Sequence, residues 1–307
     1  MCNLVHLIKK INKFNDFLIK IFLKFHLYFI VILIRKLKHF LVKKYLIKDI
    51  KNIIISYKAR PAFLSHSDSM PIWVCWFQGV DSMPVLVKKC YESILKYTGN
   101  RKVNFIDDKN ISTYIKLPEI IEKKYKTGKI TKTHLTDILR MGLISQNSGM
   151  YMDCTLFLTK KIPDYYFTVN IFPGLKHPEE KKWLYHHIEN GRWTEYFIAS
   201  CNKGSKLFSF VYDCLIKYWE NNDEMIDYFL VDYYIDFAYS FFADVKSEID
   251  SFPKNNFHNT ALRNCLNDTF DELKWKDICS DTFVNKLNWR IRKNENIKHS
   301  FWNELFD

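Results

Sequence analysis

The chain has 307 residues, of which 48% are hydrophobic and 17% aromatic, so it is long and apolar enough to bury a sizeable core. Only eight Gly and eight Pro are present, which excludes collagen-like and other low-complexity classes. The eight cysteines show no CxxC and no Cys/His spacing typical of zinc sites, so we expect reduced thiols in a cytosolic setting.

The net charge of +12 is concentrated at one end of the chain. Residues 1–60 hold 14 Lys and Arg but only two acids, whereas residues 61–307 hold 32 Lys and Arg and 32 Asp and Glu. A nucleic-acid-binding domain carries its basic stripe on the folded body. We therefore expect no nucleic-acid partner.

The N-terminal stretch 4–47 contains no Gly or Pro and predicts one basic amphipathic helix. At about 100° per residue, one side of that helix collects Lys9, Lys13, Lys20, Lys24, Arg35 and Lys38. The longest uncharged run, 25–34, has ten residues, and a spanning helix needs about 20. We expect residues 1–62 to lie on the anionic inner face of the plasma membrane, as a peripheral cytoplasmic attachment. A snorkelling signal-anchor and a helix packed on the body remain open.

Residues 63–307 read as one α/β domain, with a core over 70–245 and a C-terminal extension over 246–307. A short apolar strand at 71–77, a helix at 84–99 and a second strand at 102–107 predict a βαβ unit and a parallel sheet. The periodicity further predicts helices over 118–126, 131–148, 206–220 and 224–242.

The apolar run GMYMDCTLFL, residues 149–158, contains one acid, Asp153, at the expected end of a strand. Ligands of open α/β sheets bind at the carboxyl ends of the strands. Thr155 shares the face of Asp153 in an extended chain, and hard cations such as Mg²⁺ or Mn²⁺ take carboxylate and hydroxyl oxygens together with phosphate. The alternative is a turn or capping Asp with no ligand.

Asp137 and Arg140 are three residues apart on the predicted helix 131–148, so they share one face. That face is expected opposite the apolar stripe of the helix. The pair is either a solvated ion pair or a device that hydrogen-bonds sugar hydroxyls and a phosphate together.

Two segments, IWVCWFQGVDSMPVLVKKCYESI and LTDILRMGLISQNSGMYMDCTLFL, resemble the capsular polysaccharide synthesis glycosyltransferases. These are family-32-like enzymes related to yeast-type initiating mannosyltransferases and, more distantly, to clostridial glucosylating toxins. The resemblance implies a GT-A-like fold with a Rossmann-like βαβ sheet, a UDP- or GDP-sugar donor, a Mn²⁺ or Mg²⁺ ion and retention at the anomeric carbon. The acceptor it implies is a growing surface glycan or lipid-linked glycan.

Carried over residue by residue, the resemblance assigns the donor base to Trp76, beside Gly79 of the Trp…Gly pattern. It assigns the donor sugar and phosphate to Asp137 and Arg140, and it places Tyr151 beside the donor.

The same carry-over makes Asp153 the first acid of a metal-binding DxD motif and a catalytic residue with Asp137 and Arg140. Thr155 stands where the second acid would be. In NKLNWR, residues 285–290, Asn285 and Lys286 match a His-Lys pair that serves the diphosphate, with Asn285 reaching the metal.

Two other functional hypotheses remain. Thr155 in place of an acid favours a catalytically idle GT-A-fold scaffold in a membrane polysaccharide-assembly complex, and another metal-dependent nucleotide-using transferase is also compatible. In the glycosyltransferase hypothesis, front-face attack needs no protein nucleophile, whereas a double displacement needs a carboxylate such as Asp232.

Overall fold

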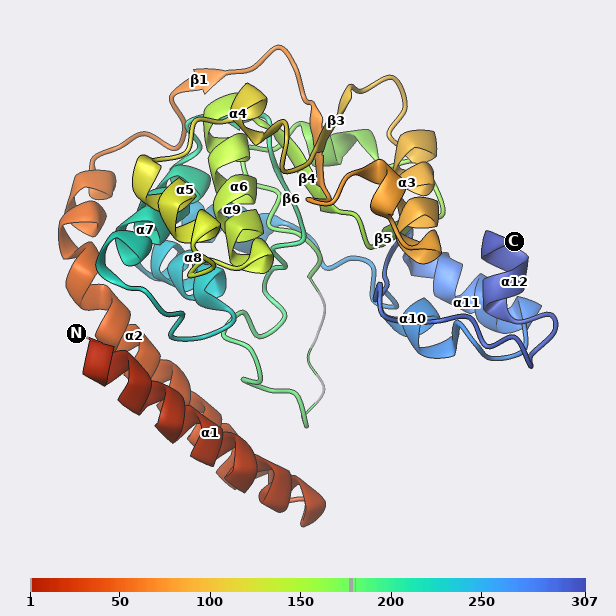
Figure 1. The fold of residues 1–307 in the computed structure, drawn as a ribbon, viewed down its shortest axis with the longest axis horizontal. Helices are drawn as coiled ribbons and strands as arrows, with labels where there is room; N and C mark the ends of the chain where they lie inside the picture. Colours follow the sequence, from red (N-terminus) through yellow and green to blue (C-terminus); the bar gives the residue numbers. More distant parts are fainter. Residues whose placement is uncertain (1, 177–178, 180) are drawn as a thin grey trace.

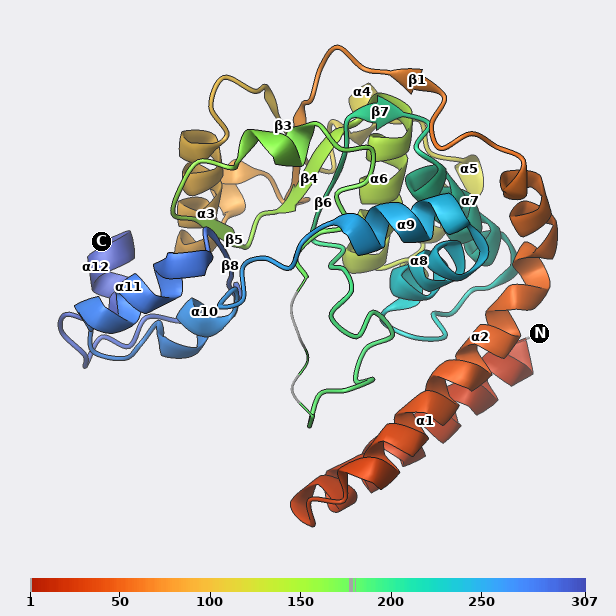
Figure 2. The same cartoon turned by 180° about the vertical axis from the view of Figure 1, so that it is seen from behind.

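The computed structural model describes residues 2–176, 179 and 181–307. A central α/β body lies between an N-terminal helical hairpin and a C-terminal helical region, which project at opposite ends (Figures 1 and 2). The α-helices are α1 Cys2–Lys24, α2 Tyr28–Lys58, α3 Val85–Tyr97, α4 Ile111–Tyr114, α5 Glu119–Lys126, α6 Lys132–Asn147, α7 Lys206–Asn221, α8 Leu230–Phe241, α9 Ala243–Ser251, α10 Ala261–Cys265, α11 Glu272–Asp281 and α12 Phe301–Phe306. The strands are β1 Ser65–His66, β2 Ile72–Cys75, β3 Val103–Ile106, β4 Gly149–Asp153, β5 Leu156–Leu158, β6 Phe197–Ser200, β7 Asn202–Lys203 and β8 Val284–Lys286.

The main sheet has four strands in the order β3-β2-β4-β6. Strand β2 runs parallel to both β3 and β4, and β6 pairs antiparallel to β4. The predicted strand–helix–strand unit is therefore β2-α3-β3, and the predicted α/β class with a parallel sheet is confirmed. Gly149 begins β4 with φ 104°, and a Cβ at this position would collide with the carbonyl oxygen of Pro71, so the close approach requires glycine.

Alternation along the strands divides the core into two layers. Ile72 and Val74 of β2 pack with Met150 and Met152 of β4 in the cluster that also contains α3. The other face of the sheet, represented by Trp73, packs in the larger cluster with α2, α6, α7 and α8. Side chains of β4 that face α6 therefore stand on the opposite side from α3.

Helix α8 begins at Leu230, six residues after the start predicted from the pattern. The preceding segment has side-chain partners outside a helix. The Tyr218 hydroxyl accepts a hydrogen bond from Ile226 N and donates one to the Glu224 carbonyl oxygen, and Asp227 accepts from Phe229 N. These bonds satisfy backbone groups that the predicted first turns would have used.

The N-terminal segment forms two helices, so the single helix expected over 4–47 is wrong. The chain reverses at residues 25–27, where His26 has φ 55°, and α1 folds back along α2. The second half of α2 packs on α7 and α8 through a buried row, which includes Val42, Tyr45, Leu46, Ile50, Ile54 and Tyr57. Helix α2 is therefore part of the body.

The basic face expected on one helix is divided between two helices and is partly turned inward. The Arg35 guanidinium is buried and donates hydrogen bonds to the carbonyl oxygens of Lys182 and Leu184. Lys38 pairs with Asp227 at 2.9 Å. Several phenylalanines of the hairpin are instead exposed, including Phe14, Phe17, Phe25, Phe29 and Phe40. Within residues 2–176, 179 and 181–307, no helix carries an apolar stretch long enough to cross a membrane.

Candidate functional site

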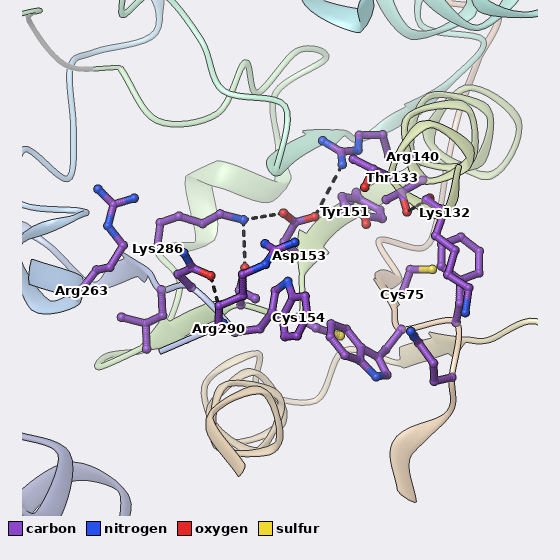
Figure 3. A pocket seen from close by; sticks show the side chains of 18 of the residues that line it. Cys75, Lys132, Thr133, Arg140, Tyr151, Asp153, Cys154, Arg263, Lys286 and Arg290 are labelled. Atoms are coloured by element: carbon purple, nitrogen blue, oxygen red, sulfur yellow. Dashed lines mark hydrogen bonds and ion pairs between the residues drawn. The ribbon is translucent and has the colours of Figure 1, made fainter. Parts of the chain in front are cut away.

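A cavity of about 550 Å³ opens at the carboxyl ends of β2 and β4 (Figure 3). Cys75 and Asp153, the last residues of the two strands, are direct neighbours in the parallel register. Other walls are the first turns of α6 and the segment 286–290, which begins at the last residue of β8. The cavity is lined by Cys75, Trp76, Phe77, Gln78, Lys132, Thr133, Thr136, Arg140, Tyr151, Asp153, Cys154, Thr155, Tyr228, Arg263, Lys286, Leu287, Asn288, Trp289 and Arg290.

The N-terminal end of α6 faces this cavity. Thr131 caps the helix by accepting a hydrogen bond from His134 N. Lys132, Thr133 and Thr136 line the wall just beyond the cap. The partial positive charge of a helix N-terminus favours an anion at this position.

Asp137 and Arg140 are buried, which excludes the solvated ion pair. The Arg140 side chain is 5% exposed, and its Nη2 lies 3.4 Å from Asp137 Oδ1 and 3.7 Å from Asp153 Oδ1. Its Nη1 lies 3.6 Å from Glu195 Oε1. Arg140 thus joins carboxylates from α6, β4 and the segment before β6. Asp137 is behind the cavity wall and does not line the cavity.

Burial and charge act in opposite directions on these carboxyls. Burial raises the pKa of Asp137 to about 7, although Arg140 opposes the shift. Burial also acts to raise the pKa of Asp153, but the charges of Lys286 and Arg140 outweigh it and hold that pKa below the usual value. Asp153 is therefore an ionised group between two cations at neutral pH.

Lys286 reaches from β8 to the end of β4 (Figure 3). Its Nζ lies 2.5 Å from Asp153 Oδ2 and donates a hydrogen bond to Thr155 Oγ1 at 2.9 Å. It also lies 4.4 Å from the centre of the Tyr196 ring. The lysine is positioned by the β5–β8 ladder, in which Leu156 pairs with Lys286, and by a hydrogen bond from Leu287 N to the Thr155 carbonyl oxygen.

The residues expected to hold Mn²⁺ or Mg²⁺ do not fit that role in this arrangement. Asp153 and Thr155 face the cavity as predicted, but Lys286 binds an oxygen of each. Within the described part of the chain, no group of three or more His, Cys, Asp or Glu is placed to hold a metal ion. A hard dication could use one carboxylate and one hydroxyl together with phosphate oxygens, but here both protein oxygens already accept hydrogen bonds from an ammonium.

Two tryptophans meet at the cavity. The rings of Trp76 and Trp289 lie edge to face, with centroids 6.4 Å apart and an interplanar angle of 77°. Tyr151 stands on the other side, with the Arg140 guanidinium 5.1 Å from its ring centre. Gly79 does not line the cavity; with φ 84° it forms the turn after Trp76, where its N–H donates to the Trp76 carbonyl oxygen at 3.0 Å.

Two predicted residues point away from the cavity. The Asn285 side chain is fully buried and its Nδ2 lies 3.5 Å from the Phe157 carbonyl oxygen, because β8 turns alternate side chains to opposite faces. This placement does not support Asn285 as a metal ligand. Asp232 is 1% exposed and accepts a hydrogen bond from Trp193 Nε1 at 3.0 Å, so it does not reach the cavity as a nucleophile.

A family model described as "Capsular polysaccharide synthesis protein" matches residues 28–305. The chain belongs to this family. The match begins at the first residue of α2, in agreement with the packing of that helix on the body. The family part of the resemblance is thereby confirmed, whereas the specific link to family 32, yeast-type mannosyltransferases and clostridial toxins stays a prediction.

Among solved structures, the chain is similar to the PaToxG glycosyltransferase, with 13% identity and a TM-score of 0.39. That comparison covers 69% of this chain and 83% of the other. The search of curated proteins returned no match.

Four residues of this family member's site were not singled out from the sequence. Arg263 comes from α10 and carries no local signal, because its position depends on how the C-terminal region folds back. Trp289 and Arg290 lie in the NKLNWR stretch. An aromatic residue next to a cation there could have been recognised as a candidate ligand-binding pair. Glu195 contacts Arg140 only through tertiary folding.

Proposed function

We propose that this protein is a GT-A-like glycosyltransferase. It would move a sugar from a UDP- or GDP-sugar to a glycan or lipid-linked glycan acceptor in surface polysaccharide synthesis. The observation that carries the proposal is the cavity at the carboxyl ends of parallel strands, because it combines tryptophans, cations and a helix N-terminus. Family membership supports the biosynthetic setting.

The lining suggests a division of labour. Trp76 and Trp289 offer aromatic faces and edges for the donor base. Lys286, Arg263 and Arg290 supply positive charge for a diphosphate. Arg140 lines the cavity and orients Asp153 and Tyr151, and Asp137 holds Arg140 from behind the wall.

The proposed reaction needs little covalent participation by the protein. The bond between the anomeric carbon and the phosphate oxygen breaks with its electron pair on the phosphate. The acceptor oxygen bonds to the anomeric carbon from the same face, and the acceptor proton passes to the departing phosphate. Retention follows without a protein nucleophile. It suits a cavity whose carboxylate, Asp153, is already bound by Lys286 and Arg140.

Donor binding tests the proposal. The full chain is titrated with a panel of UDP- and GDP-sugars by calorimetry and thermal shift. We expect at least one donor to bind, and Trp289→Ala to weaken it by about tenfold, as loss of one stacking contact predicts. Trp183→Ala is the matched control, since Trp183 is 44% exposed and outside the cavity lining. Absence of binding to every donor would favour the idle scaffold.

We also propose that the hairpin α1–α2 attaches the protein peripherally to the inner face of the plasma membrane. The support is the exposed phenylalanines named above, interspersed with exposed lysines such as Lys13, Lys20, Lys24 and Lys36. Apolar side chains would enter the headgroup boundary while the lysines contact anionic lipid.

Vesicle sedimentation of the full chain tests the attachment. Binding should require anionic lipid and weaken partly at high salt, because salt screens only the charge contribution. Phe29→Gln should reduce binding about tenfold, as burial of one Phe is worth about 1.5–3 kcal/mol. Leu273→Gln is the control, because Leu273 is 77% exposed on α11, whereas Phe29 is 73% exposed on α2. Equal binding of both variants and wild type would contradict the proposal.

A further inference from the structure

The Lys286 ammonium is placed where it could balance the negative charge of the donor diphosphate. Its Nζ lies 2.5 Å from Asp153 Oδ2 and 2.9 Å from Thr155 Oγ1, the two oxygens that a DxD-like site would offer to a cation (Figure 3). The side chain is only 20% exposed. The ammonium therefore stands where a divalent ion would bind.

The position is fixed by the backbone. Lys286 N donates to the Asn259 carbonyl oxygen at 2.6 Å, and Leu287 N donates to the Thr155 carbonyl oxygen at 2.9 Å. The backbone of Lys286 is thus held next to the carboxyl end of β4, and the contacts of Nζ with Asp153 and Thr155 hold the ammonium itself.

The charges of the cavity lining also indicate that the protein itself supplies the positive charge. The described residues that line the cavity include one carboxylate, Asp153, against five cations: Lys132, Arg140, Arg263, Lys286 and Arg290. Arg140 is already surrounded by acids, and Lys132 lies 3.7 Å from Asp108. Lys286 uses two of its three N–H groups on Asp153 and Thr155, so we assign its third N–H, together with Arg263 and Arg290, to an anion.

A metal–diphosphate complex and a metal-free diphosphate require different charged side chains in the cavity lining. A dication neutralises most of the charge of a diphosphate, and the protein then supplies carboxylates to hold the ion. A bare diphosphate requires fixed cations from the protein itself. The cavity, with several cations and one acid, matches the second requirement.

We propose that Lys286, with Arg263 and Arg290, replaces the divalent cation, so that the diphosphate of the donor binds and leaves without a metal ion. This inference rests on the proposed glycosyltransferase function. Lys286 keeps its contacts with Asp153 and Thr155 and directs its one remaining N–H at the phosphate. As the anomeric carbon–oxygen bond breaks, the charge that develops on the departing phosphate is met by ammonium and guanidinium groups.

The test compares metal-free and metal-loaded protein. UDP, GDP and their sugars are titrated into the full chain in EDTA and in excess Mn²⁺, and release of nucleoside diphosphate is followed under both conditions. We expect equal binding and release with and without the metal. Binding or release only with Mn²⁺ overturns the role of Lys286 and leaves the donor function standing. Absence of binding under both conditions overturns the proposed function and this inference together.

Two variants sharpen the result. Lys286→Met removes the charge at similar length and should weaken nucleoside diphosphate binding by about 10- to 100-fold in EDTA. Lys286→Asp places a second carboxylate opposite Asp153 and should make binding depend on Mn²⁺. Lys276→Met on α11, outside the cavity, is the control and should bind as wild type. Unchanged EDTA binding by Lys286→Met would overturn the inference, whatever its folding stability.

Discussion

The cavity and the N-terminal hairpin use the same kinds of residue in opposite ways. At the cavity, the charged side chain of Arg140 is buried and contacts Asp137 behind the wall, and the Trp76 and Trp289 rings contact each other. In the hairpin, Phe14 and Phe29 face outward, while Arg35 is buried against the body. A buried charge is costly unless an opposite charge or a hydrogen-bonding group lies close to it. A group of exposed apolar rings marks a surface that contacts something other than water. The first region fits the proposed charged donor, and the second fits the proposed attachment to a membrane surface.

The largest effect should come from dividing the hairpin. Deletion of residues 1–27 removes α1 and the reversal, and it should leave a folded domain. Deletion of residues 1–60 also removes Leu46, Ile50 and Tyr57 from the core, and large-to-small changes at single buried positions already cost about 2–5 kcal/mol each. That variant should not fold.

Thermal unfolding and circular dichroism of the two deletions provide the measurement. A cooperative transition in the 1–60 deletion would show that α2 is an appendage after all. The result would then restore the boundary at residue 62 expected from the charge pattern.

Arg140→Met should have the next largest effect. Removal of this guanidinium leaves Asp137 buried without its partner and brings Asp153 and Glu195 together without the shared cation. Removing one partner of a buried pair costs about 3–5 kcal/mol. Denaturant unfolding measures it. Thr136→Ala, one turn earlier on the same helix, is the control and should cost much less. A loss for Arg140→Met below about 1 kcal/mol would mean that the pair is solvated.

Some of this arrangement was predictable and some was not. The apolar run at 71–77, the capped helix after Thr131 and the acid at the end of GMYMD carry local signals, and they gave β2, α6, β4 and the place of the site. Lys286 was predicted to serve phosphate, but its contact with Asp153 joins residues 133 positions apart. No local pattern encodes such a contact.

The hairpin shows another limit of sequence patterns. A stretch without Gly or Pro predicts continuous helix, yet the chain reverses at His26, where a non-glycine residue adopts φ 55°. The reversal places α1 against α2, and such contacts between helices are tertiary information. The burial of Arg35 is tertiary information too, because its guanidinium contacts the carbonyl oxygens of Lys182 and Leu184.

The remaining effect is a pH dependence of stability, which is spread over several pH units. Burial raises the pKa of Asp137 from 3.8 to about 7 in the folded protein. Its contribution is therefore complete below the unfolded pKa and is lost as the pH rises through about 7, with a slope of at most about 1.4 kcal/mol per pH unit. Buried histidines act oppositely, because burial lowers the pKa of His39 and of His134 to about 4.

The difference between wild type and Asp137→Asn isolates this carboxyl. The unfolding free energy of wild type minus that of Asp137→Asn should decrease as the pH is raised from 4 to 7. Denaturant titrations at several pH values measure this difference. A gap that stays constant across this window would mean that Asp137 is ionised throughout it.

The central claim is that the cavity turns over a nucleotide sugar, and release of UDP or GDP from a donor panel by the full chain tests it most directly. We predict release from at least one donor by wild type, and a rate lower by at least about tenfold in Asp153→Asn, because Lys286 then loses its ionised partner. Release should be unaffected in the control Asp277→Asn, since Asp277 lies on α11 outside the cavity. Folded protein that releases nothing from any donor, or an Asp153→Asn variant as fast as wild type, would contradict the account.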